Sequence, residues 1–342
     1  MSAPPQNERE LDALLSEPRA ETAAALARVP GDIVILGAGG KMGPTLAHMA
    51  ARAARDAGTA RRVIAVSRFS SARAAHALSV AGIETLTCDL LDREAVRALP
   101  DAPNVVFMAG QKFGTSDAPS RTWMMNVVVP AHCAERYADS RIVAFSTGNV
   151  YPLVKVSNGG ARETDATAPV GEYAESCLGR ERVFEHFAAT RGTRVAIVRL
   201  NYAIDLRYGV LADIAMNVMA GAPVSLTMGY VNVIWQRDAS RAALELLPHA
   251  ASPPLVLNVT GSATLSVREL ASAIGERLGK TPKFTGTEAN DALLSNTSRM
   301  QQLLSPFDFR LGMMLDWVAD WVRNKRPMLG RPTHFETRDG AF

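Results

Sequence analysis

The sequence predicts an α/β protein built on a doubly wound parallel sheet, followed by a smaller mixed C-terminal lobe. Short runs that are apolar throughout alternate with stretches of helix-forming composition, which is typical of strands buried on both faces by crossover helices. The first of these runs leads directly into a glycine-rich loop and then a helix. After residue 200 the regular alternation stops and helices dominate.

The elements of the predicted sheet follow one another along the chain. Two short helical patterns, around residues 11–15 and 21–28, precede it and form an N-terminal appendage over residues 1–30. The sheet domain then spans residues 31–200. Its expected strands are 32–36, 62–67, 83–88, 104–109, 141–146 and 194–200, and its expected helices are 44–57, 72–80, 120–138 and 171–190.

Residues 201–330 predict the smaller lobe, whose elements interleave with the first domain and which we expect to cover a substrate. The tail, residues 331–342, is polar, and we expect it to be loose or pinned to a neighbouring molecule. The lobe's expected helices are 211–220, 266–278, 297–304 and 311–324, with a short apolar run at 255–259.

Composition excludes several classes of protein. Apolar residues make up 47% of the 342 residues and charged residues 21%, which excludes wholesale disorder. The net charge is only +3, and the basic residues are scattered along the chain, which argues against nucleic-acid binding. The three cysteines form no C-x-x-C pair, the six histidines have no metal-ligand spacing, and no apolar run is long enough to span a membrane. We therefore expect a cytoplasmic protein without a metal site.

The loop after the first strand reads Gly-Ala-Gly-Gly-Lys-Met-Gly over residues 37–43. Glycines let a backbone turn sharply and approach a pyrophosphate, and the following helix offers free N–H groups and a partial positive charge. The strand before and the helix after favour a dinucleotide site over a tight turn without a ligand. The residues expected to bind the cofactor here are Gly37, Gly39, Gly40, Lys41, Met42 and Gly43.

The end of the second strand bears on which dinucleotide is bound. An acidic side chain there would hold the ribose 2′-hydroxyl of NAD, whereas an arginine accommodates the 2′-phosphate of NADP. The strand ends in Ser67 and Arg68, and Lys41 can add a second positive charge. We predict NADP, with NAD as the alternative, unless Arg68 is simply a solvated surface residue.

Together these residues resemble the extended short-chain dehydrogenase/reductase family, the NAD-dependent epimerase/dehydratase group, whose sheet domain is Rossmann-like. The resemblance covers about residues 31–325. Its marks are the glycine loop, Asp89-Leu90, Asn126, the segment Ser146–Tyr151, Tyr173, the segment Arg199–Tyr202, and Asp238.

The resemblance implies roles for several side chains. Thr147 would hydrogen-bond the substrate hydroxyl or carbonyl, and Tyr173 would be the general acid/base beside the nicotinamide. A positioned O–H donor suits this chemistry, because hydride transfer to a carbonyl develops oxyanion character. Further residues expected to contact the cofactor are Asp89, Leu90, Ala109, Gly110 and Asn126.

The family's tyrosine is normally followed four residues later by a lysine, but Cys177 stands there. A lysine one helical turn away would lower the pKa of the phenol, which a neutral thiol cannot do. Another cation can substitute, with Lys112 the best candidate and Arg180 the second; alternatively, the reaction needs no lowered pKa, or the protein binds cofactor without turnover. We favour Lys112, although it is otherwise an ordinary loop lysine and Cys177 a small buried hydrophobe.

The substrate is expected to differ from a sugar nucleotide. Members acting on sugar nucleotides usually carry an arginine shortly before the Asp238 position, and this chain has Val231–Trp235 there. A free sugar, sugar acid or polyol-like compound is favoured instead. The candidate substrate-binding residues, each of which could equally be structural, are Asn201, Arg207, Tyr208 and Trp235.

Two functions remain open at this stage. The first is an NAD(P)-dependent oxidoreductase or epimerase acting at a secondary alcohol or ketone of a carbohydrate-like small molecule. The second is a catalytically silent NADP(H)-binding regulator. The resemblance also implies a homodimer, formed through the helices at 120–138 and 171–190.

Overall fold

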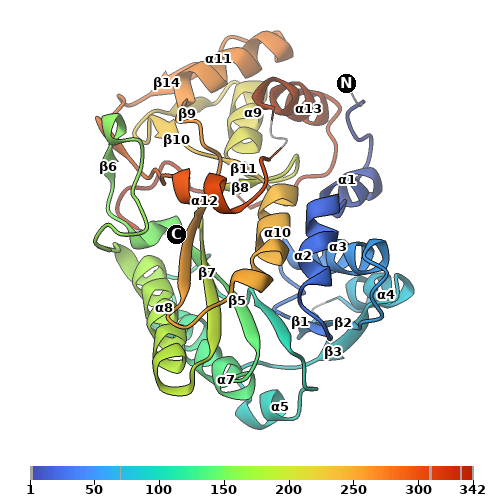
Figure 1. Cartoon of the computed structure of the whole chain (residues 1–342). Coiled ribbons are helices and arrows are strands. Elements are labelled where there is room, and N and C mark those ends of the chain that lie inside the picture. The colour runs from blue at the N-terminus through green and yellow to red at the C-terminus, as the bar shows by residue number, and fades with distance from the viewer. Residues whose placement is uncertain (1–2, 70, 308–309, 332, 341–342) are drawn as a thin grey trace.

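The computed structural model describes residues 3–69, 71–307, 310–331 and 333–340. Its centre is a seven-stranded parallel sheet in the order β12-β7-β5-β4-β1-β2-β3 (Figure 1). This order confirms the doubly wound, Rossmann-like fold, with the sheet growing in both directions from β1. The strands are β1 (Ile33–Leu36), β2 (Val63–Ser67), β3 (Glu84–Thr87), β4 (Asn104–Phe107), β5 (Arg141–Thr147), β7 (Arg194–Leu200) and β12 (Leu255–Val259).

Helices cover both faces of this sheet, which explains why its inner strands are apolar throughout. Ile33 and Ile35 of β1 belong to one buried cluster, while Val34 and Leu36 belong to the other. The first cluster includes residues of α2 (Ala20–Ala27), α3 (Gly43–Asp56), α4 (Ala72–Val80) and α10 (Gln236–Glu245). The second includes residues of α5 (Arg93–Arg97), α7 (Val129–Arg136) and α8 (Gly171–Arg191).

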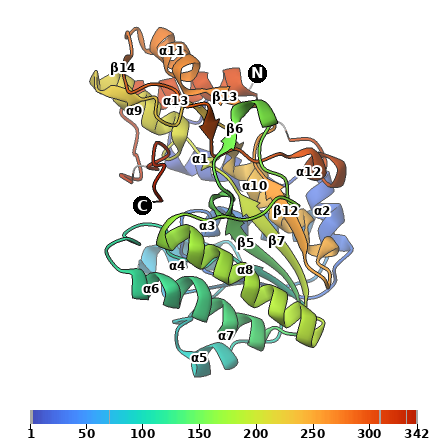
Figure 2. The ribbon, with the colours of Figure 1, turned by 90° about the vertical axis from the view of Figure 1, so that its left-hand side faces the viewer.

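Much of the chain after residue 200 gathers around a second buried cluster, which we call the lobe, but the chain crosses between it and the sheet more than once. The apolar run at 255–259, expected in the lobe, is β12 and pairs with β7 in the main sheet. The lobe has its own buried cluster and lies above the carboxyl ends of the strands (Figure 2). Its helices are α9 (Val210–Ala220), α11 (Val267–Leu278) and α13 (Leu311–Arg323), and α12 (Ser298–Leu303) packs against β12.

The N-terminal appendage packs against both parts of the molecule. Leu11 and Leu15 of α1 (Glu8–Leu15) are buried in the lobe's cluster, whereas Leu26 of α2 is buried with the sheet. Thr22 donates a hydrogen bond of 2.8 Å to the buried carboxylate of Glu245 on α10. These helices therefore join the lobe to the sheet.

The expectation of a single helix over 120–138 is wrong. The segment is divided into α6 (Pro119–Trp123), a π-helical turn at Met124–Val128 and α7. Pro130 has no amide hydrogen to donate to the carbonyl of Asn126, which interrupts the α-helical pattern. The turn carries Asn126, which is completely buried.

The C-terminal tail is not loose in the part that the structure describes. Thr333 and Phe335 are buried, and the Phe335 ring belongs to the lobe's cluster. Gly340 lies against Gly171 at the start of α8. The tail thus packs on its own chain, although Pro332 and residues 341–342 lie outside the described residues.

Two further observations concern the described residues alone. Among their helices, none combines the length and the apolar character that crossing a bilayer requires. No group of three or more histidine, cysteine, aspartate or glutamate side chains in that part of the chain could hold a metal ion.

Candidate functional site

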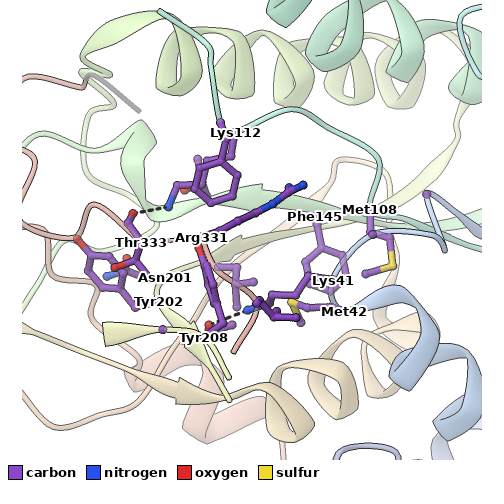
Figure 3. A pocket seen from close by; sticks show the side chains of 18 of the residues that line it. Lys41, Met42, Met108, Lys112, Phe145, Asn201, Tyr202, Tyr208, Arg331 and Thr333 are labelled. Atoms are coloured by element: carbon purple, nitrogen blue, oxygen red, sulfur yellow. Dashed lines mark hydrogen bonds between the residues drawn. The ribbon is translucent and has the colours of Figure 1, made fainter. Parts of the chain in front are cut away.

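A cavity of about 690 Å³ lies beyond the carboxyl ends of β1, β4, β5 and β7, between the sheet and the lobe. Open parallel sheets bind their ligands at this edge. Figure 3 shows the side chains that surround it, which come from both halves of the chain. The cavity is lined by the loop after β1, the end of β5, the start of α8, the segments 200–203 and 207–210, and the tail.

The glycine loop forms one wall of the cavity. A Cβ added at Gly37, where φ is +90°, would lie 2.6 Å from the amide nitrogen of Ala109. At Gly39 it would lie 2.5 Å from the Ser67 hydroxyl, and at Gly43 2.2 Å from the carbonyl oxygen of Ala38. Larger residues would push this loop away from the sheet.

The loop also brings the N-terminus of α3, a helix of 14 residues, toward the cavity. Free amide groups and the partial positive charge of a helix N-terminus suit a pyrophosphate. The geometry of the loop therefore fits the diphosphate of a dinucleotide. Gly37, Gly39, Gly40 and Met42 would lie along that group.

The two expected catalytic hydroxyls meet in this cavity. Thr147 ends β5 and Tyr173 lies in the first turn of α8, and their side chains are hydrogen-bonded to each other. Both line the cavity. A ligand oxygen placed between them would therefore have two O–H groups beside it.

The electrostatic surroundings favour a protonated Tyr173. Burial raises the pKa of this phenol well above its usual range, and the thiol of Cys177 raises it further. The Arg180 guanidinium and the hydrogen bond with Thr147 lower the pKa of Tyr173 without offsetting the burial. Burial likewise raises the pKa of Cys177, so the thiol is neutral and cannot replace a lysine.

Arg180 is part of the floor beneath the site. Its guanidinium donates to the carbonyl oxygen of Phe145 at 2.8 Å and to Oδ1 of Asn126 at 2.7 Å. Asn126 also bonds both the amide and the carbonyl of Gln111. These contacts tie α8, β5 and the loop after β4 together, and they place Asn126 behind the cavity rather than on its surface.

Lys112 lies in the cavity, as its assignment as a catalytic residue requires. Its ammonium donates to the carbonyl oxygen of Thr333 at 3.3 Å (Figure 3). Burial lowers the pKa of Lys112 to about 8, and Asp213, Cys177 and Glu336 act in the opposite direction. The charge of Lys112 therefore acts on Cys177, which lies one helical turn from Tyr173 on α8.

The side chain of Lys41 departs from its expected place beside Arg68. Its ammonium donates to the carbonyl oxygen of Ala203 at 3.2 Å and lies 3.8 Å from the ring centre of Tyr208 (Figure 3). The residue follows Gly40 in the loop, and from there the side chain extends to the lobe. Its charge thus belongs to the substrate side of the cavity, which corrects the expectation of a second cation for a 2′-phosphate.

The substrate candidates are divided between the cavity and the core. Asn201 and Tyr208 line the cavity, as expected. Arg207 also lines it, but its guanidinium is bound by Asp205 and Asp12 at 3.2 and 2.9 Å. Trp235 is 3% exposed and belongs to the lobe's cluster, so its assignment to substrate binding is wrong.

Several predicted cofactor residues lie outside the cavity lining. Arg68 is exposed at the end of β2, where Ser67 contacts the glycine loop. Asp89 is exposed and accepts a hydrogen bond from the amide of Leu91, while Leu90 is buried. Nothing in these contacts decides whether they border an adenosine, and they remain predictions, as do Ala109 and Gly110.

Several residues that line the cavity were not predicted from the sequence. Asp12 comes from the N-terminal appendage, Leu329 from the last residues of the 201–330 segment, and Arg331 and Thr333 from the tail. None belongs to a recognisable motif, because only tertiary folding brings them to the sheet edge. Met108, Phe113 and Phe145 were also not predicted, whereas Ser146, Asn149 and Tyr202 lie in the two segments that carry the family resemblance.

Ser146 connects the cavity to a buried polar network. Its hydroxyl donates to Glu181, whose carboxylate binds the Arg199 guanidinium at 2.7 Å. Arg199 in turn donates to the Tyr151 hydroxyl, which donates to Asn258 on β12. The network holds β5, β7, β12 and α8 in register behind Thr147 and Tyr173.

Comparison with known proteins places this geometry in a family. The model of the NAD dependent epimerase/dehydratase family matches residues 33–253. The chain belongs to that family, a class of NAD(P)-dependent enzymes. A comparison with curated proteins gives no match.

Solved structures share the fold across most of the chain. Pal from Bacillus thuringiensis is 16% identical, with a TM-score of 0.73 over 86% of this chain and 100% of its own. The UDP-glucose 4-epimerase of Thermotoga maritima, determined with UDP-glucose, is 18% identical, with a TM-score of 0.70 over 86% and 99%. A UDP-glucuronic acid 4-epimerase variant from Bacillus cereus, determined with NAD, is 15% identical, with a TM-score of 0.72 over 86% and 99%.

Proposed function

We propose that this protein is an NAD(P)-dependent oxidoreductase or epimerase, with NADP(H) favoured and NAD(H) as the alternative, acting at a secondary alcohol or ketone of a carbohydrate-like small molecule. The observation that carries the proposal is the hydrogen-bonded pair of Thr147 and Tyr173, in a cavity whose opposite wall is the glycine loop. The nicotinamide, when bound, supplies or accepts the hydride. The protein's own residues orient the reacting oxygen and move its proton.

In the direction of carbonyl reduction, negative charge develops on the substrate oxygen. Thr147 and Tyr173 offer O–H donors to that oxygen, and Tyr173 gives it a proton as the hydride reaches carbon. The high pKa of Tyr173 keeps the phenol protonated and ready for this step. In the reverse direction the alcohol proton passes to the Tyr173 oxygen while the hydride leaves carbon.

The reverse direction needs a cation near Tyr173, and we assign that role to Lys112. The Arg180 guanidinium already donates hydrogen bonds to Phe145 and Asn126, and it holds the elements beneath the site together. Lys112 lines the cavity itself, and its ammonium interacts electrostatically with Cys177. Its charge would stabilise the phenolate as the lysine of the family pattern does.

The substrate is proposed to be a free sugar, sugar acid or polyol rather than a sugar nucleotide. Solved structures with this fold include enzymes named for UDP-sugars. This chain has no arginine at Val231–Trp235, and Val231, Val233 and Ile234 are buried. The segment therefore has no guanidinium to offer a nucleotide phosphate.

A silent NADP(H)-binding regulator is the second candidate function. The observation favouring it is that Tyr173 has a neutral thiol as its neighbour on α8 and a raised pKa. A phenol that never ionises can hold a ligand without catalysing oxidation. This candidate shares the cofactor site and differs in turnover.

A homodimer is also proposed. Trp123, Met124 and Val170 are large apolar side chains that are 39%, 43% and 53% exposed, and they lie on α6, the π-helical turn and the residue before α8. Burying them against a second copy would remove apolar surface from water. Light scattering on the purified protein should give twice the mass of one chain, and the mass of one chain would contradict it.

The test of function is turnover by cofactor-loaded protein. Protein loaded with NADP⁺ is mixed with panels of sugars, sugar acids and polyols, and protein loaded with NADPH with the matching ketones, while nicotinamide absorbance is followed. The wild-type protein should change the redox state with at least one compound or convert one compound into its epimer, which chromatography of the mixture detects. Tyr173→Phe should turn over about 10²–10⁴ times more slowly, because it lacks the proton donor, yet bind cofactor as before. Cofactor binding with neither a redox change nor an epimerised product across the panels would support the silent regulator instead.

A further inference from the structure

The cavity is rich in positive charge. Among the described side chains that line it, four are cationic and one is a carboxylate. The cations are Lys41, Lys112, Arg207 and Arg331, and the carboxylate is Asp12. The diphosphate of the cofactor is expected at the glycine loop, whereas the ammonium of Lys41 and the side chain of Tyr208 lie together toward the lobe, where a different anion would meet this charge.

One of the four cations is already neutralised. The guanidinium of Arg207 bonds Asp205 and Asp12, and it lies 3.6 Å from Glu8. It therefore fastens the appendage to the lobe. The excess charge comes from the other three.

Lys41 and Arg331 meet at Tyr208. The ammonium of Lys41 lies over the Tyr208 ring, at 3.8 Å from its centre. Arg331 is exposed but lines the same cavity, and its positive charge acts to lower the pKa of the Tyr208 phenol, against the larger effect of burial. Figure 3 shows the three side chains around one part of the cavity, each from a different segment of the chain. Because burial keeps the pKa of Tyr208 above its usual range, the phenol stays a donor.

The tail holds Arg331 at this place. Two residues further on, the amide and the hydroxyl of Thr333 both donate to one carboxylate oxygen of Asp213 on α9. The hydroxyl of Tyr202 donates to the carbonyl oxygen of Phe335, and Arg338 forms an ion pair with Asp291 at 2.5 Å. Arg331 is thus carried on a segment fixed at several points and is not a residue of a free end.

The nearby carboxylates are engaged by other groups. Asp205 bonds Arg207, and Asp213 bonds Thr333. Asp205 and Asp213 favour the charged form of Lys41, and Asp213 and Glu336 favour that of Lys112, but burial outweighs them for both lysines. A ligand anion beside Lys41 would favour the charged form of its ammonium further, against the effect of burial.

We infer that Lys41, Arg331 and Tyr208 form a subsite for a carboxylate of the substrate, with Lys112 adding positive potential. The substrate class is then a hydroxy acid or keto acid of the sugar-acid type. This inference rests on the proposed function, because it places the acid's reacting carbon near Thr147 and Tyr173. Charge-assisted hydrogen bonds from an ammonium and a guanidinium are among the stronger polar contacts in proteins.

The test compares pairs of ligands that differ only in the acid group. Gluconate is paired with glucitol, galactonate with galactitol, and glucuronate with glucose. Each is titrated calorimetrically into protein saturated with NADP⁺, so that binding is measured without turnover. At least one acid should bind about tenfold or more tightly than its neutral partner, which corresponds to about 1.4 kcal/mol.

Variants then locate the effect. Arg331→Met and Lys41→Met should each reduce the preference for the acid toward unity, and Arg331→Lys should restore part of it. Lys280→Met removes an exposed lysine at the end of α11 and serves as the control. The affinity for NADP⁺, titrated separately, should not change in any of them.

The outcomes separate this inference from the proposed function. If acids bind with the expected preference but no redox change follows, the subsite stands and the proposed turnover is wrong. If neutral polyols are turned over and acids have no advantage, the subsite is wrong and the proposed function stands. If no acid binds, or if the variants weaken the binding of NADP⁺ instead, the assignment of the subsite is also wrong.

Discussion

The two walls of the cavity are built in different ways. The glycine-loop wall comes from one continuous segment, residues 37–45, whose backbone is fixed by its contacts with β2 and β4. The lobe wall gathers Asp12, Lys112, Tyr208 and Arg331 from four distant segments. The first wall is shaped by backbone and suits a cofactor common to a family, while the second is made of side chains and suits one substrate.

The largest effect should come from Lys112, which belongs to the lobe wall and bonds the tail at Thr333. Lys112→Ala should reduce turnover by about 10²–10³, because the phenolate of Tyr173 loses its stabilising charge. The affinity for NADP⁺ should stay within about twofold, and an exposed lysine changed in the same way, Lys283→Ala, should match wild type. Unchanged turnover in steady-state kinetics would show that Lys112 belongs only to the substrate wall.

A single substitution, at Gly37, should disrupt the glycine-loop wall. Gly37→Ala should lower the free energy of unfolding by about 2–5 kcal/mol, because its Cβ would meet Ala109 at a positive φ. Gly58→Ala is the matched control, with φ of +63° and nothing within 4 Å of the added Cβ, and should cost about 1–2 kcal/mol. Denaturant unfolding measures both.

The same variants can be titrated with NADP⁺. Gly37→Ala should lose affinity for it, and Gly58→Ala should keep it. Equal stability and equal cofactor affinity in the two variants would show that the close approach of the loop to the sheet has no part in binding.

Arg68 tests cofactor choice. Arg68→Ala should weaken the binding of NADP⁺ about tenfold or more, because a charge-assisted contact with the 2′-phosphate is lost. The affinity for NAD⁺ should not change. Lys41→Met should leave the affinities for both nucleotides unchanged, since the Lys41 side chain lies at the lobe wall. A preference for NAD⁺ that Arg68→Ala does not alter would overturn the NADP assignment.

The smallest effect is a pH dependence of the lobe wall. Burial lowers the pKa of Lys41 and of Lys112 to about 8. The ammonium groups are charged below that pH and lose their protons above it, so the affinity for a sugar acid should fall severalfold between about pH 8 and about pH 9. The charged or titratable groups that face them are Asp205, Asp213, Arg207, Cys177 and Glu336.

Calorimetry across this pH range, with the neutral partner as control, measures the effect. The neutral ligand should bind equally at both ends of the range. Acid binding that strengthens above pH 8 would contradict the role given to the two lysines.

Local pattern was enough to predict the sheet and the loop wall. Apolar runs and glycine spacing act within a few residues, so six of the sheet's seven strands and the turn at 37–43 could be read from neighbouring residues. The seventh, β12, was expected in the lobe, because its pairing with β7 joins segments far apart in the chain. The break near Pro130 was missed, because a single helix was expected over 120–138. The place of Asn126 in that turn depends on Arg180, far along the chain.

The lobe wall could not be predicted in the same way. Arg331 and Asp12 reach the cavity because α1 and the tail pack on the lobe, which no short motif encodes. Lys41 was expected beside Arg68 because its sequence position suggested the cofactor. A long side chain can instead reach across a cavity, to Tyr208 here.

The most direct test of the central claim is a titration of the purified protein with NADP(H) and NAD(H), following bound nicotinamide by calorimetry or fluorescence. We predict saturable binding of one nicotinamide dinucleotide per chain, tighter for the phosphorylated form, that is lost in Gly37→Ala. A folded protein that neither retains nor binds any of the four nucleotides would contradict the account.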